Sequence, residues 1–505
     1  MRDPAPWQKK YALMLLFACL FGLAIQYLFI GHAAGVSVLL GIIGFYSMYF
    51  YTIKGRLGGF DQWKGQAIVG WLLLIPVFLL AMTYMIYASS LFRLLNSLAL
   101  PFVLVMQTLV LSRSSKHPWY RVSFFQDVWH QCFVTPFRHI PVPFGILKSL
   151  FSSGDNSHSK WGQLRKAALG LLLAAPILFI VIALLASADR IFQSWLSEIP
   201  RWFGDVSILE AIFRICTAVC MAIYCFCYLW GILFPKMAEA ASTTNSEDQP
   251  QDDLSLESRK SFSLDPITAM TFLGSINFVY VLFAVIQFSY LFGAAKGLLP
   301  SGVAYAEYAR RGFAELVLVA IINMGLLLSG LHLIRRMGRF VEILRRIMLS
   351  MLIGCTIVML TSAYSRLSLY EEAYGFTQTR LLVHGFMLFL GVLLILAFFR
   401  VWWERISLSK AYIGFAILAY VLMNYVNLDQ KIAVNNIERY ERTGDIDLVY
   451  LSKLSTDAMP ALLELQAKHP ELPSLELTLS TMRAAAQQDA WSSWNLSKYR
   501  AGKLN

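Results

Sequence analysis

The stretch LVHGFMLFLGVLLILAFFRV, residues 382–401, decides the class of fold. It supplies about the 20 residues that a helix needs to cross the hydrocarbon of a bilayer. Arg400 stands near one end and His384 near the other, and the residues between them are uncharged. The stretch therefore predicts a transmembrane helix.

Ten further apolar runs of this length lie along the chain. The eleven runs lie near residues 12–30, 34–53, 67–88, 94–112, 167–187, 207–234, 267–293, 312–334, 345–364, 382–401 and 408–427. The first run follows two lysines, as a signal peptide would, but the next run starts at once, which favours a retained helical hairpin. The sequence predicts an all-α fold, a polytopic transmembrane helix bundle of about 11 spans, with a small C-terminal helical extramembrane domain.

Composition supports the same class. Of the 505 residues, 57% are apolar and 15% are charged, and the mean hydropathy is +0.56. One soluble core cannot bury so much apolar surface, so the bilayer must cover part of it. The 7 cysteines lie almost all within apolar runs, which indicates packing in a core rather than a disulfide framework.

The net charge of +12 comes from Lys and Arg residues that gather in alternate loops. If the N-terminus is cytoplasmic, the great majority of these residues fall on the inner side, as the positive-inside rule requires. An odd number of spans then places the C-terminus on the extracytoplasmic side. The sequence predicts a multi-pass protein of a cytoplasmic membrane, with the lipid bilayer as its partner and no nucleic acid partner.

Polar segments divide the chain further. Segment 113–166 is basic and aromatic, which suits a cytoplasmic position against anionic lipid, and a solvated loop is the alternative. Segment 236–264 has the composition of a disordered cytoplasmic linker. The tail 429–505 predicts short helices with ends at Gly444, Asp445 or Asp447, Ser455 and Pro470. The predicted parts are 1–112 (four spans), 113–166, 167–235 (spans 5 and 6), 236–264, 265–428 (spans 7 to 11) and 429–505.

Two polar clusters lie near the predicted outer ends of the spans, where ionisable side chains are costly and need a reason. The first is YAEYARRGFAEL, residues 305–316, in which Tyr305, Tyr308, Gly312 and Glu315 share one helix face. The second is YSRLSLYEEAYGFTQTR, residues 364–380. The candidate polar site predicted from these clusters and from the end of the last span comprises Tyr305, Tyr308, Arg310, Glu315, Arg366, Tyr370, Tyr374, Arg380, Asn427 and Asp429.

Two interpretations of this candidate site compete. In the functional one, Arg and Tyr side chains line an outward-facing cavity that binds an anionic lipid or a small anionic solute. In the structural one, Glu315, Glu371 or Glu372 pairs with Arg366 or Arg380, and the tyrosines form an interfacial aromatic belt. Inside the sixth run, Arg214 stands four residues after Glu210, a spacing that predicts a structural ion pair.

Several specific motifs are missing from the sequence. It has no Walker A sequence, no GxSxG elbow, no HExxH and no GxGxxG. ATP hydrolysis, serine hydrolysis, zinc proteolysis and dinucleotide binding therefore lack their usual signals. The sequence predicts no cofactor and no metal ion, and it leaves the catalytic residues of any enzyme unidentified.

The chain resembles a bacterial family of polytopic membrane proteins classified only as a domain of unknown function. The residues that carry the resemblance are the clusters YAEYARRGFAEL and SRLSLYEEAYGFTQTRL, then Asn427, Asp429, Asn435, Asn436 and DLVYLSKLSTDAMP at 447–460. The resemblance covers residues 165–460. It implies a bacterial cytoplasmic (inner) membrane protein and no particular activity.

Three functions from different classes follow. A transporter or a permease that handles a solute or lipid, with an outward-facing polar site, is the favoured hypothesis because of the many spans and the polar residues at one side. The alternatives are a non-catalytic membrane sensor or assembly partner that uses its helical tail, and an envelope transferase or hydrolase with Glu315, Glu371 or Glu372 as general base. An enzyme is the less favoured class.

Overall fold

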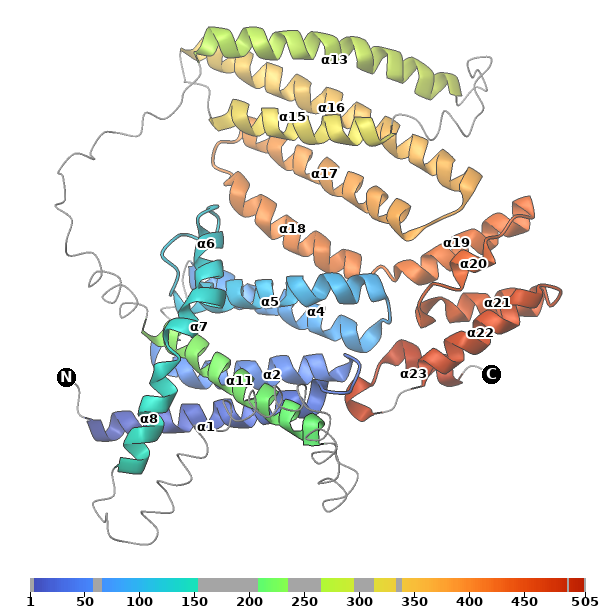
Figure 1. Cartoon of the computed structure of the whole chain (residues 1–505). Helices are drawn as coiled ribbons and strands as arrows, with labels where there is room; N and C mark the ends of the chain where they lie inside the picture. Colours follow the sequence, from blue (N-terminus) through green and yellow to red (C-terminus); the bar gives the residue numbers. More distant parts are fainter. Residues whose placement is uncertain are drawn as a thin grey trace, which may run out of the picture. The chain divides into compact units, whose positions relative to one another are not determined.

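The computed structural model describes residues 4–57, 66–152, 208–234, 265–294, 313–332, 338–487 and 490–503 (Figure 1). All regular elements in these ranges are helices, which confirms the predicted all-α class. The chain divides into two compact units. Unit 1 comprises Met1–Ile86, Arg93–Asp248 and Gln488–Tyr499, and unit 2 comprises Tyr87–Phe92, Gln249–Gln487 and Arg500–Asn505.

Unit 1 contains the N-terminal spans and the segment that follows them. Its helices are α1 (Pro4–Phe29), α2 (Val36–Leu57), α3 (Gln66–Leu72), α4 (Leu74–Ile86), most of α5 (Ser90–Ser112), α6 (Phe124–Trp129), the π-helix η2 (His130–Val134), α7 (Thr135–Arg138), α8 (Pro141–Ser152) and α11 (Ile208–Leu233). A Cβ atom on Gly22 of α1 would lie 2.2 Å from the Ala218 carbonyl oxygen of α11. Small residues thus allow these two helices to pack backbone to backbone.

A buried hydrogen-bond chain joins three helices of unit 1. The Tyr49 hydroxyl of α2 donates to the Thr108 carbonyl of α5 at 2.8 Å, and the Thr108 hydroxyl lies 2.6 Å from the Tyr228 hydroxyl of α11. All three side chains are almost fully buried. In an apolar interior such bonds fix which helices are neighbours, because an unpaired hydroxyl there is costly.

Part of the predicted tail belongs to unit 1. The Val36 N–H donates to the Trp494 carbonyl at 3.0 Å, and the fully buried Asn495 amide donates to the Tyr84 carbonyl at 2.8 Å. A Cβ atom on Gly35 would lie 2.6 Å from the Ser493 backbone. Residues 490–495, with the 3-10 helix η5 (Trp491–Ser493), thus pack on α2 and α4 rather than on the helices of the predicted tail domain 429–505.

Unit 2 contains five long helices that lie side by side, followed by a group of short helices (Figure 1). The long helices are α13 (Pro266–Ala294), α15 (Phe313–His332), α16 (Arg339–Tyr374), α17 (Gln378–Trp402) and α18 (Leu408–Asn424). Leucine and methionine side chains of α13, α15, α16 and α17 form a common buried core. These helices position the polar groups described below.

The short helices of unit 2 form a second core. They are α19 (Leu428–Thr443), α20 (Leu448–Leu451), the 3-10 helix η4 (Thr456–Ala458), α21 (Met459–Lys468) and α22 (Pro473–Ala486), and α23 (Leu496–Lys503) follows. Gly444, with φ of +76°, ends α19, the Asp447 side chain caps α20, and the Ser455 hydroxyl caps η4. The helix ends predicted at these three residues are confirmed.

Eight helices of the described residues are long and apolar enough to cross a membrane, or nine if the bent pair α18 and α19 is one span. The predicted run 167–187 lies outside the described residues. The predicted run 312–334 corresponds to α15, whose apolar part, Glu315–Leu331, is shorter than the other spans. The linker 236–264 lies wholly outside the described residues, and the division between the units falls within it.

Candidate functional site

Helix α16 carries buried polar groups at three levels. It has 36 residues, so it is about 54 Å long, against a hydrocarbon thickness of about 30 Å. Glu342 lies near its first turn, Thr356 near its middle and Glu371 near its last turn. The three levels are therefore about 21 Å apart along the helix axis.

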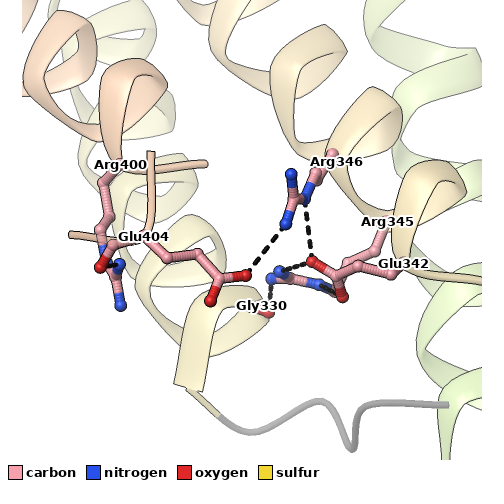
Figure 2. A network of polar contacts seen from close by, with 6 residues as sticks. All are labelled: Gly330, Glu342, Arg345, Arg346, Arg400 and Glu404. Carbon is pink, nitrogen blue, oxygen red and sulfur yellow. Dashed lines mark hydrogen bonds and ion pairs between the residues drawn. The ribbon is translucent and has the colours of Figure 1, made fainter. Parts of the chain in front are cut away.

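The first level is an ionic network (Figure 2). The Glu342 carboxylate accepts hydrogen bonds from Arg345 at 2.6 and 2.9 Å and from Arg346 at 3.0 Å. Arg345 also donates to the Gly330 carbonyl of α15, and Arg346 donates to the Glu404 carboxylate beyond α17. The network thus ties together the ends of three helices, and it lies at the end of the bundle that the sequence predicts to be basic.

The second level is a set of amide contacts between spans. Asn323 of α15 is 1% exposed and donates to the Thr356 hydroxyl of α16 at 2.9 Å. Asn277 of α13 is 3% exposed and donates to the Met348 carbonyl of α16 at 3.0 Å. The side-chain oxygen of each asparagine has no hydrogen-bond partner. Such amides hold membrane helices together and leave acceptors inside the bundle.

The third level is the turn between α16 and α17, residues 370–380, which we name the α16–α17 corner. Gly375 ends α16 with φ of +84°, a conformation that glycine adopts readily. The guanidinium of Arg380 donates to the Tyr374 and Gly375 carbonyls and lies 4.4 Å from the centre of the Tyr370 ring.

Arg439 of α19 donates to the Glu372 and Ala373 carbonyls at 2.8 Å. Two arginines thus bind the carbonyl end of α16, where the helix dipole is negative.

Asn436 of α19 connects the corner to the short helices. Its amide nitrogen donates to the Phe376 carbonyl at 2.9 Å, and its amide oxygen accepts from the Phe376 N–H at 2.9 Å. A Cβ atom on Gly375 would lie 2.7 Å from the same amide oxygen. One side chain therefore satisfies both backbone groups of Phe376, and this geometry requires glycine at 375.

The bend between α18 and α19, which measures 58°, brings a buried carboxylate to the corner. Asn427, with φ of +43°, caps α19. Asp429 is 1% exposed and accepts from the Gln378 side chain at 2.6 Å and from the Ser455 N–H at 3.2 Å. The Gln378 N–H donates to the Tyr450 hydroxyl at 2.8 Å, and burial raises the pKa of Tyr450 above its ordinary value. The Tyr450 phenol therefore stays neutral at physiological pH.

A carboxylate and an imidazole meet beside the corner, within two spans. Glu371 of α16 is 3% exposed, and its Oε2 lies 3.2 Å from Nδ1 of His384 on α17. The Glu371 Oε1 atom is buried without a hydrogen-bond partner. The His384 ring packs on the Tyr364 ring, with a centroid distance of 4.3 Å, and its Nε2 lies 3.5 Å from the Ser368 hydroxyl. We name Glu371 and His384 the buried dyad.

The structure brings part of the predicted site together. Arg380, Tyr370 and Tyr374 form one cluster at the corner, and Asp429 reaches it through Gln378.

Other residues of the predicted site lie elsewhere. Arg366 lies earlier on α16 and is partly buried. Glu315 is exposed in the first turn of α15, and among the described residues no polar contact joins it to the corner. Tyr305, Tyr308 and Arg310 lie outside the described residues.

The polar contacts at the corner differ in kind from the predicted ones. The structural interpretation expected Arg380 to pair with a glutamate, but its guanidinium binds backbone carbonyls, and Glu371 pairs with a histidine. The sequence reasoning missed the role of Asn436, Arg439 and Gln378 as bridges. The available signal was the end of α16 at Gly375, because a helix end leaves carbonyls that need donors. The predicted pair of Arg214 and Glu210 is confirmed, at 2.7 Å.

The comparisons with known proteins give one match. The family model described as a domain of unknown function, DUF4153, matches residues 74–465. The match begins at Leu74, the first residue of α4, so it includes part of the N-terminal spans that the sequence resemblance left out. Searches of curated proteins and of solved structures found no match. Since the matched region covers most of the chain, this membrane protein belongs to the DUF4153 family.

Proposed function

We propose that the chain is a permease that moves a small solute or a lipid head group across the membrane and binds a proton at the buried dyad as it does so. The observation that carries the proposal is Glu371, a 3% exposed carboxylate in a membrane-spanning helix with one oxygen against His384 and the other without a partner. Intramembrane carboxylates and histidines are rare, and proton relays of transporters are a common reason for their presence.

The discontinuous pair α18 and α19 supports the proposal. Transporters often place their sites where a membrane helix is interrupted, because backbone groups freed there can bind a ligand. Here the interruption at Asn427 lies next to Asp429, whose side chain reaches the N-terminus of α17, the helix that carries His384. Movement of α17 would therefore act on both the interruption and the dyad.

The proposed substrate class is a small anionic solute or an anionic lipid. This class follows from the arginines of the predicted polar site, because a guanidinium binds the oxygens of carboxylate and phosphate groups.

Solid-supported membrane electrophysiology on proteoliposomes tests the proposal. A step in pH should produce a protein-dependent current in the wild type, and steps in small carboxylate or phosphate solutes at fixed pH should produce a sustained current with at least one of them. Glu371→Gln should remove at least nine-tenths of both currents because it removes the proton-binding oxygen.

Glu372→Gln is the matched control, because Glu372 is exposed and adjacent to Glu371 in sequence. It should leave both currents unchanged. Currents of equal size in the wild type and Glu371→Gln would contradict the proposal, and so would their absence from wild-type vesicles that contain folded protein.

A membrane sensor or assembly partner is the second candidate function. The observation that favours it is the attachment of the short helices to the corner through Asn436 and Arg439, which can transmit a displacement between α19 and α16. Photocrosslinkers at Val449 and Leu477, which are 70% and 69% exposed, should then capture one partner protein, and Arg439→Ala should abolish that capture. Deletion of 429–505 is a poor test, because it also removes residues 490–495 from unit 1.

A further inference from the structure

The segment that contains α6, η2, α7 and α8 runs across the other helices of unit 1. Figure 1 shows it transverse to α1, α2, α4 and α5. It follows the span that ends at Ser112, and α7 and η2 pack against α11. A helical segment transverse to the spans of its own unit lies along the membrane plane, as interfacial helices do.

Contacts with α11 fix the depth of this segment. The Gln131 side chain donates to the Tyr228 carbonyl at 2.9 Å, and the Tyr224 hydroxyl donates to the Cys132 carbonyl at 3.2 Å. The contacted positions lie in the last turns of α11, which ends at Leu233. At 1.5 Å per residue they lie within about 14 Å of the end of that span. The segment therefore lies near the level where α11 leaves the hydrocarbon.

The outward face of the segment is aromatic. Phe125, Trp129, Phe133 and Phe137 recur every four residues and are 50%, 64%, 53% and 65% exposed. The Trp129 and Phe133 rings pack with a centroid distance of 4.3 Å. Four residues exceed one α-helical turn and fall short of one π turn, so the π-helix between 130 and 134 keeps the four rings on one face. Aromatic side chains are typical of the boundary between acyl chains and head groups.

The segment that carries the aromatic face also carries positive charge. Arg121, Arg138 and Lys148 are exposed on the segment, and Asp127 is the one acidic residue between residues 113 and 152. Asp127 already binds His117, through the His117 N–H at 2.8 Å and the imidazole at 3.1 Å. Positively charged side chains outnumber carboxylates in this segment, which favours its contact with an anionic membrane surface.

We propose that residues 121–140 form a docking site for anionic membrane lipids, in which the four aromatic side chains enter the head-group boundary and Arg121 and Arg138 bind lipid phosphate. This inference concerns unit 1 and does not depend on the proposed transport function. Arginine suits the site because its planar guanidinium binds two phosphate oxygens at once. The committed ligand is a lipid with a negatively charged head group, such as phosphatidylglycerol.

Native mass spectrometry of the full chain in detergent tests the site. The probes are phosphatidylglycerol and phosphatidylcholine of the same acyl composition, added at equal concentration. The wild type should retain at least threefold more phosphatidylglycerol than phosphatidylcholine. The double variant Arg121→Gln, Arg138→Gln should lose at least two-thirds of this excess. The matched control Lys431→Gln, Arg442→Gln removes two exposed positive charges from α19 and should retain the wild-type excess.

A second measurement addresses the aromatic part of the site. The fluorescence of Trp129 is obtained as the difference between the wild type and Trp129→Phe in nanodiscs. This difference should be at least twofold smaller in brominated phosphatidylglycerol than in the unbrominated lipid. Equal retention of the two lipids by the wild type would overturn the proposal. Retention that is unchanged in the double variant, or lost equally in the control, would overturn it as well.

Discussion

The Asn436 side chain pairs with both backbone groups of Phe376, at 2.9 Å for each bond, although 60 residues separate them. It links α19 to the turn between α16 and α17 by one donated and one accepted hydrogen bond, as two paired residues of neighbouring strands would. Asn436 also donates to the Ile432 carbonyl of its own helix, which fixes its rotamer.

Replacement of Asn436 should destabilise unit 2. Asn436→Ala leaves the N–H and the carbonyl of the partly buried Phe376 without their partner, which costs about 1–3 kcal/mol in the free energy of unfolding. Asn435→Ala is the control, because Asn435 is the adjacent residue and, among the described residues, its side chain makes no hydrogen bond to the corner. Thermal unfolding in one detergent compares the two variants, and equal midpoints would contradict the expected role.

Gly375→Ala should be more costly than Gly444→Ala. Both glycines have positive φ, +84° and +76°, so both substitutions carry a backbone cost of about 1 kcal/mol. The added Cβ atom at 375 also lies 2.7 Å from the Asn436 amide oxygen, whereas nothing lies within 4 Å at 444. The difference in unfolding free energy between the variants measures this contact, and it should shrink when Asn436→Ala is the background.

Arg439→Lys should not preserve stability. The guanidinium of Arg439 donates at once to the Glu372, Ala373 and Asp445 carbonyls, and a lysine ammonium cannot reproduce that fork. We expect a loss of about 1 kcal/mol and faster proteolysis of the segment around residue 374. Arg442→Lys, at an exposed position of the same helix, should behave as the wild type. Identical proteolysis of all three proteins would exclude a capping role.

Two of the ion pairs at helical spacing should differ in how much they contribute to stability. Arg345 is 8% exposed and Glu342 is 20% exposed, whereas Arg214 is 32% exposed and Glu210 is 53% exposed. Glu342→Gln leaves a buried guanidinium poorly compensated, with an expected loss of about 2–3 kcal/mol. Glu210→Gln should cost less than about 1 kcal/mol. Unfolding of both variants in parallel checks the order, and the reverse order would refute the burial argument.

The folded segment around His130 should be less stable in acid. Desolvation by partial burial, followed by the positive charges of Arg138 and Lys116, lowers the pKa of His130 below its ordinary value of 6.5, and Asp127 opposes that shift. The unfolded chain therefore binds a proton more readily than the folded one, so stability falls as pH falls below about 6.5. Between pH 7.5 and 5.5 the free energy of unfolding should fall more for the wild type than for His130→Asn. The fall for Arg138→Gln should be intermediate. Parallel pH profiles would contradict this assignment.

Local patterns predicted the elements, and tertiary contacts decided the site. The apolar runs predicted most of the long helices, and Gly444, Asp447 and Ser455 marked real helix ends, because these signals act within a few residues. The partners of Arg380 and Glu371 could not be predicted in this way. Several donors and acceptors of the corner have suitable chemistry, and only the packing of α16, α17 and α19 selects among them.

The position of Trp494 and Asn495 in unit 1 has a consequence for biosynthesis. The N-terminal helices α2 and α4 bind these two residues, which the ribosome adds more than 400 positions after Val36. During translation α2 and α4 are therefore made before the segment that completes their packing has been synthesised. This region of the protein can therefore reach its native packing only after elongation has passed residue 495.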